Sequence, residues 1–418
     1  MPTSTKTIPK GYKQTEIGVI PADWDVKCIG DIGGVKMCRR IFNHQTKENG
    51  PIPFYKIGTF GKEADAYISQ NLYEEYRRRF SFPKKGEILI SAAGTIGRTI
   101  VYNGSPSYFQ DSNIVWIDND ESLIFNKYLN YIFETTKYNT EGGTIQRLYN
   151  SILSNTKFIC PPKPEQVEIS TTLSDIDALI EKSEILIEKK KVIKQGTMQE
   201  LLTGKRRLPG FIGEWIEKPI SNFTWFQEGP GVRTEQFTQS GVKLLNGTNI
   251  YKGKLLLDNT NRFISESEAF GPYSHFLVDA GDIVIASSGI TVDKFEEKIS
   301  FVKKSHMPLC MNTSTIRFKI LNNLMDPLFL YYFLMSKKFK NQIGAQATGS
   351  AQLNFGPSHL EKIDIYLPKD KEEQTAIATI LSDMDTEIEK LESELTKWRD
   401  MKQGMMQTLL TGKIRLIK

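Results

Sequence analysis

The chain has 418 residues, of which 39% are hydrophobic and 25% are charged, and its formal net charge is +5. This length indicates two or three domains that can each bury a core, and the composition excludes a small or disordered protein. The charge alone names no partner, because 54 basic and 49 acidic groups nearly balance. The four cysteines form no C-x-x-C pair, which argues against a zinc site or a disulfide framework and fits a reducing cytoplasm. Neither export nor a membrane span is expected, because the N-terminus has no apolar run and no stretch of about 18 apolar residues occurs.

The first part of the chain, roughly residues 1–160, is typical of a mixed α/β domain. Runs rich in β-branched residues predict strands in GEILISAAG from Gly86, TIVYNG from Thr99 and NIVWID from Asn113. A helix is expected near 127–136.

The central segment, roughly residues 161–207, predicts one long helix. From Glu165 to about Leu202 it has no proline, it is rich in Glu, Lys, Leu and Ile, and Gly204 follows its end. A heptad seam of apolar residues is interrupted by polar residues such as Lys194. The seam consists of Leu173, Ile176, Ile180, Ile187 and Leu201.

The third part, roughly residues 208–367, keeps the order of the first part although the two sequences match weakly. It begins with Trp215 in GEWIEKPISNF, as the first part begins with Trp24 in PADWDVKCIGDI. Strands are expected in GDIVIASSG and STIRFKI, and a helix near 327–338.

The last segment, roughly residues 368–418, repeats the central segment. LSDIDALIEK returns as LSDMDTEIEK with 7 of 10 positions identical, and KQGTMQELLTGKRRL returns as KQGMMQTLLTGKIRL with 12 of 15, both displaced by 208 residues. The second seam consists of Leu381, Met384, Ile388, Leu391, Leu395 and Trp398.

The repeat predicts an α+β protein in which two mixed α/β domains are joined by two long helices. A single amphipathic helix could simply lie on its own domain. Two seams in one chain favour pairing of the helices with each other, since each seam needs a partner. Antiparallel pairing would give a coiled coil with approximate two-fold symmetry, and a dumbbell with one domain at each end.

Sequence motifs for catalysis are missing. There is no phosphate-binding G-x-x-x-x-G-K-[ST] loop, no dinucleotide fingerprint and no Asp- or Asn-Pro-Pro-aromatic motif of adenine methyltransferases, and the four histidines are isolated in sequence. The carboxylates of Asp175 and Asp177, repeated as Asp383 and Asp385, could form an acid/base or metal pair. We favour a structural role, because acidic groups suit the early turns of a helix and this spacing points them to different faces. We therefore expect a non-catalytic chain.

Basic residues gather with aromatic and amide residues in three expected loops, at 36–40, 76–80 and 249–254. Lys and Arg there would contact phosphates, while Arg, Asn and Gln would read base edges; any one of these clusters could instead be a solvated surface. The candidate DNA-binding residues are Arg39, Arg40, Arg77, Arg78, Arg79 and Arg98 in the first domain and Arg233, Asn249, Lys252, Arg262, Asn312 and Gln352 in the second.

Over its whole length the sequence resembles the specificity subunit of type I restriction-modification enzymes. The resemblance rests on GYKQTEIGVIPADW from Gly11, RLPGFIGEW from Arg207, the paired proline-then-EQ helix starts at 161–166 and 368–374, and the QG-x-MQ-x-LLTGK helix ends. It implies two target-recognition domains, each reading one half of a split DNA sequence, joined by an antiparallel coiled coil whose length sets the spacer between the halves.

The same resemblance implies the partners. Two modification subunits would bind S-adenosylmethionine and methylate adenine, and restriction subunits would use ATP and Mg²⁺, while this chain would bind no cofactor. Two other functions are possible: an enzyme that itself methylates or cuts DNA, and a coiled-coil adaptor unrelated to DNA. The adaptor does not explain why the two domains differ so much while their helices barely differ, whereas two half-sites of different sequence require that pattern.

Overall fold

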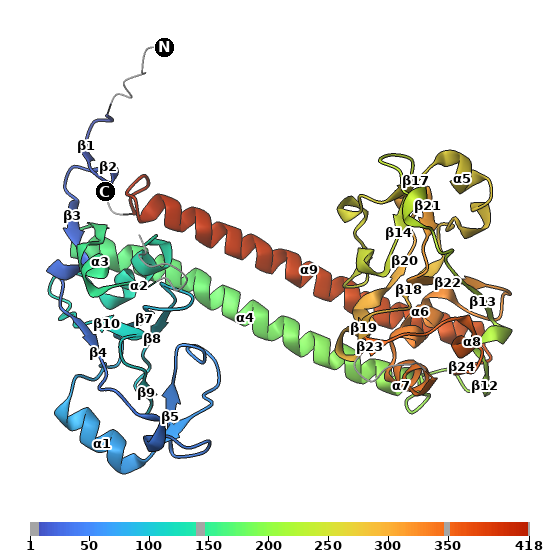
Figure 1. Ribbon diagram of the computed structural model, residues 1–418, viewed down its shortest axis with the longest axis horizontal. Coiled ribbons are helices and arrows are strands. Elements are labelled where there is room, and N and C mark those ends of the chain that lie inside the picture. Colours follow the sequence, from blue (N-terminus) through green and yellow to red (C-terminus); the bar gives the residue numbers. More distant parts are fainter. Residues whose placement is uncertain (1–7, 139–146, 347–351, 417–418) are drawn as a thin grey trace. The chain divides into compact units, whose positions relative to one another are not determined.

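The computed structural model describes residues 8–138, 147–346 and 352–416, and the chain divides into two compact units. Unit 1 consists of Met1–Glu184 and Glu394–Lys418, and unit 2 consists of Ile185–Ser393. Each unit therefore contains part of both long helices, which are labelled α4 and α9 in Figure 1.

The long helices run from Lys163 to Leu201 (α4) and from Lys371 to Leu409 (α9), within two residues of the predicted bounds. Each is closed by a turn in which Gly204 or Gly412 has a φ of 67° or 68°. In this left-handed region glycine has no steric penalty, which explains why glycine follows both helices.

Ion pairs within each unit show that the two helices pack antiparallel. In unit 1, Lys402 near the end of α9 contacts Asp177 near the start of α4 at 2.8 Å. In unit 2, Lys190 near the end of α4 contacts Glu387 in the first half of α9 at 2.6 Å. The predicted antiparallel pairing of the helices is confirmed.

The predicted seam residues face inward. Leu173, Leu201 and Leu381 are fully buried. The remaining predicted positions are buried or half-buried, namely Ile187, Ile388, Leu395, Ile176, Ile180, Met384, Leu391 and Trp398.

Unit 1 is built from two lobes, which we call proximal and distal by their distance from α4 (Figure 1). The proximal lobe has an antiparallel sheet in the order β4-β10-β7-β8, with α2 and α3 beside it. Its core includes Trp24 and Tyr128 together with Leu173 of α4 and Leu409 of α9. The elements are β4 (Val35–Met37), β10 (Ile114–Ile117), β7 (Ile88–Ser91), β8 (Thr99–Val101), α2 (Asn126–Thr135), α3 (Asn150–Asn155), the pair β3 (Asp25–Cys28) and β11 (Lys157–Cys160), and the hairpin β1 (Tyr12–Thr15) and β2 (Gly18–Pro21).

The distal lobe of unit 1 has a sheet in the order β6-β5-β9, in which β5 pairs antiparallel with β6 and parallel with β9. Its core is aromatic, with Phe54, Phe60, Tyr73, Tyr108 and Trp116 among its buried residues. The elements are β5 (Ile52–Tyr55), β6 (Tyr67–Ile68), α1 (Gln70–Arg79) and β9 (Tyr108–Phe109).

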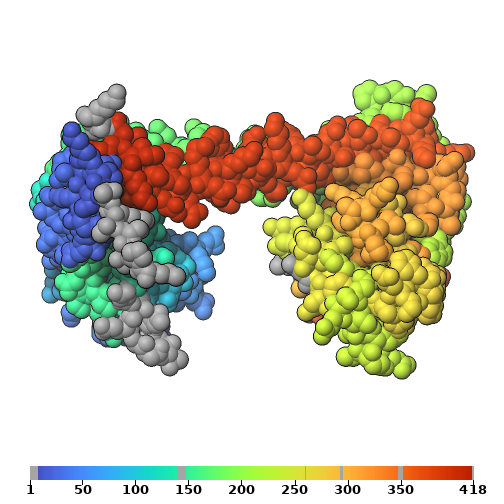
Figure 2. Space-filling model, turned by 90° about the horizontal axis from the view of Figure 1, so that it is seen from above, coloured from blue at the N-terminus to red at the C-terminus, as the bar shows by residue number. Residues whose placement is uncertain are grey.

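Unit 2 repeats this topology. Its proximal sheet has the order β13-β22-β18-β20, and its distal sheet β17-β14-β21 again joins one antiparallel and one parallel neighbour to the central strand. Figure 2 shows most of this distal lobe, in yellow-green and yellow, on the side of unit 2 away from α9. The proximal elements are β12 (Trp215–Pro219), β13 (Thr224–Glu228), β18 (Ile283–Ala286), β20 (Ile299–Phe301), β22 (Thr315–Ile320), β24 (Asp364–Pro368), α6 (Pro327–Met335), α7 (Lys337–Gln346) and α8 (Pro357–Leu360). The others are β14 (Val242–Leu245), β17 (Phe263–Ile264), β21 (Leu309–Met311), α5 (Glu266–Phe270), and the pairs β15 (Ile250–Tyr251) with β16 (Lys254–Leu255) and β19 (Ile290–Thr291) with β23 (Gln352–Leu353).

Two expected loops are regular structure. Residues 76–79 form the last turn of α1, where the side chain of Ser69 accepts a hydrogen bond from the N–H of Leu72 and so caps the first turn. Residues 249–254 form the end of a 3₁₀ turn and a β-hairpin. The loop at 76–80 was predicted from its basic residues alone. That prediction overlooked Tyr73, whose burial makes α1 an amphipathic helix. Across the described ranges, no helix combines the length and apolarity that a membrane crossing needs.

Candidate nucleic-acid interface

At the end of α1 in unit 1, arginine side chains stack on aromatic rings. The guanidinium of Arg79 lies 5.5 Å from the ring of Phe80 and forms an ion pair of 2.6 Å with Glu75. Arg39 reaches the same ring at 5.3 Å. Stacking on an aromatic ring holds an exposed guanidinium in place without occupying its outer N–H groups.

Arg77 and Arg78 extend this surface. Arg77 lies 5.9 Å from the ring of Tyr73 and 5.5 Å from that of Phe82. Arg78 is exposed and, within the part of the chain that the structure describes, makes no ion pair or hydrogen bond through its side chain. Three successive arginines thus project from one helix end, two of them stacked and one free to bind an anionic partner.

The remaining predicted residues of unit 1 are engaged within it. Arg40 donates from Nε to Asp111 at 2.8 Å, and both line a cavity of about 330 Å³. Arg98 is half-buried and donates to the carbonyl of Phe60 at 2.7 Å. Arg147 lines the same cavity as Arg40 but was missed from sequence, because it does not stand in a basic cluster.

In unit 2, Arg233, Lys252 and Arg262 are exposed on the distal lobe and on the β15–β16 hairpin. Arg262 lies 5.4 Å from the ring of Phe237, and Lys252 lies 5.4 Å from that of Tyr251. Arg262 also lines a polar cavity of about 480 Å³ where the distal lobe meets the proximal sheet. Gln352 is exposed on β23.

Asn249 and Asn312, which the sequence predicts to read bases, do not present their amides at the surface. They are 5% and 7% exposed. Asn249 accepts the N–H of Asn246 at 2.9 Å and donates to the carbonyl of Leu256, while Asn312 donates to the side chain of Asn246 at 3.0 Å. Both amides stabilise turns, which is a frequent role of asparagine.

A buried acidic residue at the start of each long helix is clasped by an arginine that follows the other helix. Glu165 accepts from Arg415 at 3.0 and 2.7 Å and from the indole of Trp24 at 2.9 Å. Arg415 also donates twice to Asp23, and these bonds, with that to Glu165 foremost, raise the pKa of Arg415, while they lower the pKa of Asp23. The clasp therefore joins the segment around Trp24 and the segment after α9 to the first turn of α4.

Unit 2 has the equivalent clasp. Glu373 is fully buried and accepts from Arg207 at 2.7 and 2.6 Å, which raises the pKa of Arg207. The ring of Trp215 lies 5.9 Å from this guanidinium. Both glutamates and both arginines are separated by the repeat distance of 208 residues, which explains the EQ helix starts noted in the sequence.

The acidic pairs of the helices have a structural role through Asp177 and Asp385. Asp177 accepts from the hydroxyl of Tyr131 at 2.7 Å and pairs with Lys402. Burial lowers the pKa of Lys402, but hydrogen bonds to Asp177 and Glu134 outweigh it and the pKa is raised.

In unit 2, Asp385 accepts from Tyr332 at 2.8 Å and pairs with Lys194. The lysines that interrupt the apolar seams are thus ion-paired across the helices. Among the described residues, no group of three or more His, Cys, Asp or Glu side chains could hold a metal ion.

Comparisons with known proteins agree with this architecture. A family model described as "Type I restriction modification DNA specificity domain" matches residues 21–191 and 213–397. The MjaVIII specificity subunit of a type I restriction enzyme from Methanocaldococcus jannaschii is 29% identical over 415 residues, which cover 95% of this chain and 94% of that protein. A putative type I specificity subunit from Haemophilus influenzae is 57% identical over 152 residues, which cover 36% of this chain and 40% of that protein.

Solved structures give the same result for the fold. The crystal structure of the S subunit of a type I restriction-modification system from M. genitalium superposes with a TM-score of 0.57 at 17% identity, covering 92% of this chain and 96% of that chain. A chain from a type I restriction-modification complex superposes with a TM-score of 0.55 at 12% identity.

Proposed function

The chain belongs to the family of type I restriction-modification specificity subunits, and from this premise we propose that each of its two units reads one half of a split DNA site. One observation carries the proposal. The units share a topology and nearly identical helices, yet their exposed basic and aromatic residues differ. A reader of two unlike half-sites needs this combination, because the frame must repeat while the reading surfaces must not.

The end of α1 and the distal lobe of unit 2 are the proposed reading surfaces. In unit 1 we assign DNA contacts to the arginines around the α1 end, and in unit 2 to Arg233, Lys252, Arg262 and Gln352. Stacked arginines can donate two hydrogen bonds to a guanine edge, and lysines and other arginines neutralise phosphates. Arg40 and Arg98 each donate one hydrogen bond within unit 1, which holds the guanidinium in place, and the side chain of Arg40 remains 60% exposed.

Chemistry is assigned to partner subunits. In this proposal, two modification subunits that carry S-adenosylmethionine methylate adenine in each half-site, and restriction subunits supply ATP- and Mg²⁺-dependent cleavage. This chain contributes recognition and binds no cofactor of its own. We also propose a cytoplasmic location, which suits its free thiols.

The paired helices are proposed to set the DNA spacer and to dock the modification subunits. Accordingly the domains are taken as 1–160 and 208–367 for recognition, and 161–207 and 368–418 for the helices. Helix length then determines the distance between the half-sites, as dimer geometry does in other DNA readers.

Co-expression with a modification subunit tests the proposal. Methylated adenines are mapped across a genome with this chain present and with it absent. A split motif that depends on the chain is the expected result, and its two halves and spacer are read from the same data. Methylation that does not depend on the chain would contradict the proposal.

A further inference from the structure

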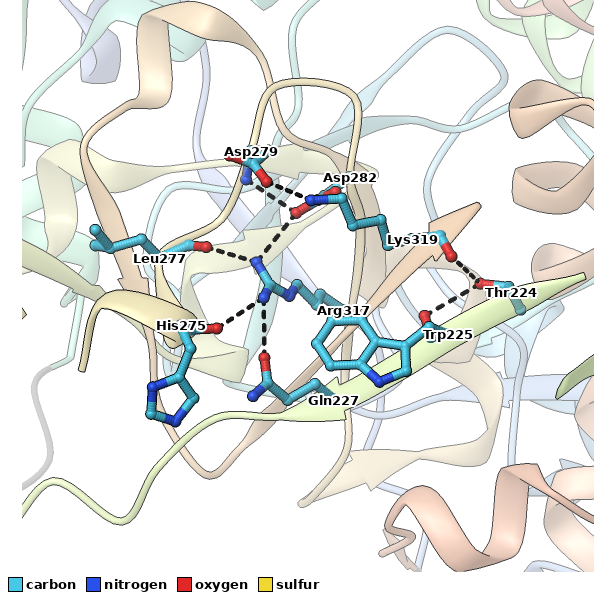
Figure 3. A network of polar contacts seen from close by, with 9 residues as sticks. All are labelled: Thr224, Trp225, Gln227, His275, Leu277, Asp279, Asp282, Arg317 and Lys319. Carbon is cyan, nitrogen blue, oxygen red and sulfur yellow. Dashed lines mark hydrogen bonds and ion pairs between the residues drawn. The ribbon is translucent and has the colours of Figure 1, made fainter. Parts of the chain in front are cut away.

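A buried arginine connects the two lobes of unit 2. Arg317 lies on β22 and is 5% exposed. Its Nη2 donates to the side chain of Gln227 at 3.0 Å and to the carbonyl of His275 at 2.7 Å, while Nη1 donates to the carbonyl of Leu277 at 2.5 Å and reaches Asp282 at 3.4 Å (Figure 3). One guanidinium therefore joins a central strand to two neighbouring elements and to a separate backbone segment.

That backbone segment belongs to the connection from the distal lobe. Residues 274–276 form a 3₁₀ turn after α5, and Leu277 bridges Cys310 of the distal strand β21. The N–H of Val278 then donates to the carbonyl of Leu309 at 3.0 Å. By holding the carbonyls of His275 and Leu277, Arg317 fixes the distal lobe to the proximal sheet.

The distal lobe of unit 2 has a small apolar core of its own, while Leu245 of β14 and Leu309 and Met311 of β21 belong to the core of the proximal lobe. Its own buried cluster among the described residues consists of Val232, Val242, Leu244, Ile264, Ala269 and Cys310, and the partly buried rings of Phe237, Tyr273 and Phe276 pack against it. The small core of the lobe gains little from burial, so the buried charge-assisted hydrogen bonds of Arg317 add to these apolar contacts in holding the orientation of the lobe.

Unit 1 has an aromatic residue, Trp116, at the position that corresponds to Arg317. On β10, Trp116 pairs with Leu89, just as Arg317 on β22 pairs with Val284 at the matching position of the neighbouring strand. Trp116 is buried in the aromatic core of the distal lobe of unit 1. The same position of the two sheets thus faces the distal lobe in both units, with an aromatic ring in one and a guanidinium in the other.

We propose that Arg317 is a positioning residue that sets the orientation of the distal lobe of unit 2 and thereby the reading of the second half-site. This inference rests on the proposed function. Arg317 itself does not contact DNA, because both its Nη groups donate to oxygens inside the unit and its Nε, which has no hydrogen-bond partner among the described residues, is buried. Lysine cannot replace it fully, because a single ammonium does not span acceptors on three segments.

The test compares Arg317→Gln and Arg317→Lys with a matched control, Lys319→Gln. Lys319 lies on the same strand and pairs with Asp279 of the same connection at 2.6 Å, but this pair is about half exposed (49% and 57%). Each variant is assembled with its modification subunit. Methylation rates are measured on the wild-type site and on sites with one base changed in the first or in the second half.

We expect Arg317→Gln to reduce discrimination at the second half-site roughly tenfold, which is within the range of a single mismatched base pair, and to leave the first half-site unchanged. Arg317→Lys should fall between this variant and the wild type, and Lys319→Gln should behave like the wild type. Unchanged discrimination in Arg317→Gln, or an equal loss at both half-sites, would overturn the proposal.

Hydrogen exchange on the same samples separates this inference from the proposed function. In Arg317→Gln, amides of residues 274–278 and of β14 should exchange at least tenfold faster, while those of unit 1 should not change. Unchanged exchange in these segments would overturn the positioning role whatever the DNA result. A wild-type complex that ignores the split site would instead contradict the proposed function alone.

Discussion

The guanidinium of Arg415 holds both carboxylate oxygens of Glu165, although 250 residues separate the two along the chain. Glu165 lies in the first turn of α4 and is 2% exposed, while Arg415 follows the end of α9. With the equivalent pair of Arg207 and Glu373, each unit fastens the start of one long helix to the segment after the other.

Arg415→Met should therefore destabilise unit 1 by about 2 kcal/mol, because it leaves a buried carboxylate with only the indole of Trp24 as donor. The free energy of unfolding is measured by urea denaturation. Arg399→Met is the control, since Arg399 pairs with Glu184 on the surface and its loss should cost less than about 1 kcal/mol. Equal losses in both variants would argue against the clasp.

Glu87 predicts a pH dependence. It is 2% exposed, its Oε1 has no hydrogen-bond partner, and burial raises its pKa above the ordinary value. The folded state therefore binds the proton more tightly than the unfolded state, so this residue's contribution to the free energy of unfolding decreases as pH rises through its titration range.

Glu87→Gln should remove that decrease, because the amide oxygen can still accept the N–H of Lys84. The variant should be more stable than the wild type by up to about 1 kcal/mol at pH 7, and the difference should shrink toward pH 4. Thermal or urea unfolding across this range measures it. A difference that stays constant with pH would show that Glu87 is not the source.

Arg78 should contribute to recognition of the first half-site only. It is exposed at the end of α1, and its alanine variant should weaken binding of the assembled complex by about 1–3 kcal/mol if it contacts a base. Binding is measured on the full site and on DNA altered in either half. Arg79→Ala is the companion variant, since Arg79 is already paired with Glu75. An equal loss for both altered sites would refute the assignment of Arg78 to one half.

The helices should act as a ruler. Inserting one heptad into both α4 and α9 would add about 10 Å at about 1.5 Å per residue, which corresponds to roughly three base pairs at 3.4 Å each. The preferred spacer in the methylated motif should lengthen by about that amount. An insertion of the same seven residues into one helix alone is the control, because the two helices then differ in length by one heptad and cannot keep the same partners on both sides of the insertion. An unchanged spacer in the double insertion would contradict the ruler.

Much of the fold could be predicted because it depends on local patterns. The uninterrupted run from Glu165 and its repeat gave both helices to within two residues, and the apolar runs of β7, β10, β18 and β22 were evident from their composition. The pairing partners of Lys194 and Lys402 could not be predicted, because they lie on the opposite helix and depend on register.

The candidate site was harder to predict because exposure decides it. The arginines of α1 were found because they cluster in the sequence, but the helix α1 was not predicted. It depends on the burial of Tyr73 in the core of the distal lobe, most of whose residues lie far from Tyr73 in the sequence. Asn249 and Asn312 have the side chains of base readers, yet their neighbours in space use both amides. The role of Arg317 could not be predicted from the sequence, because two of its partners are backbone carbonyls of a segment about 40 residues away.

The most direct measurement replaces residues 24–160 with a second copy of residues 215–367, each segment beginning at its tryptophan, and maps methylated adenines for this chimera with the modification subunit. We expect the first half-site to disappear and the second half-site to occur twice as an inverted repeat, because the two helices run antiparallel. A chimera that still methylates the original asymmetric site would contradict the claim that each unit reads its own half.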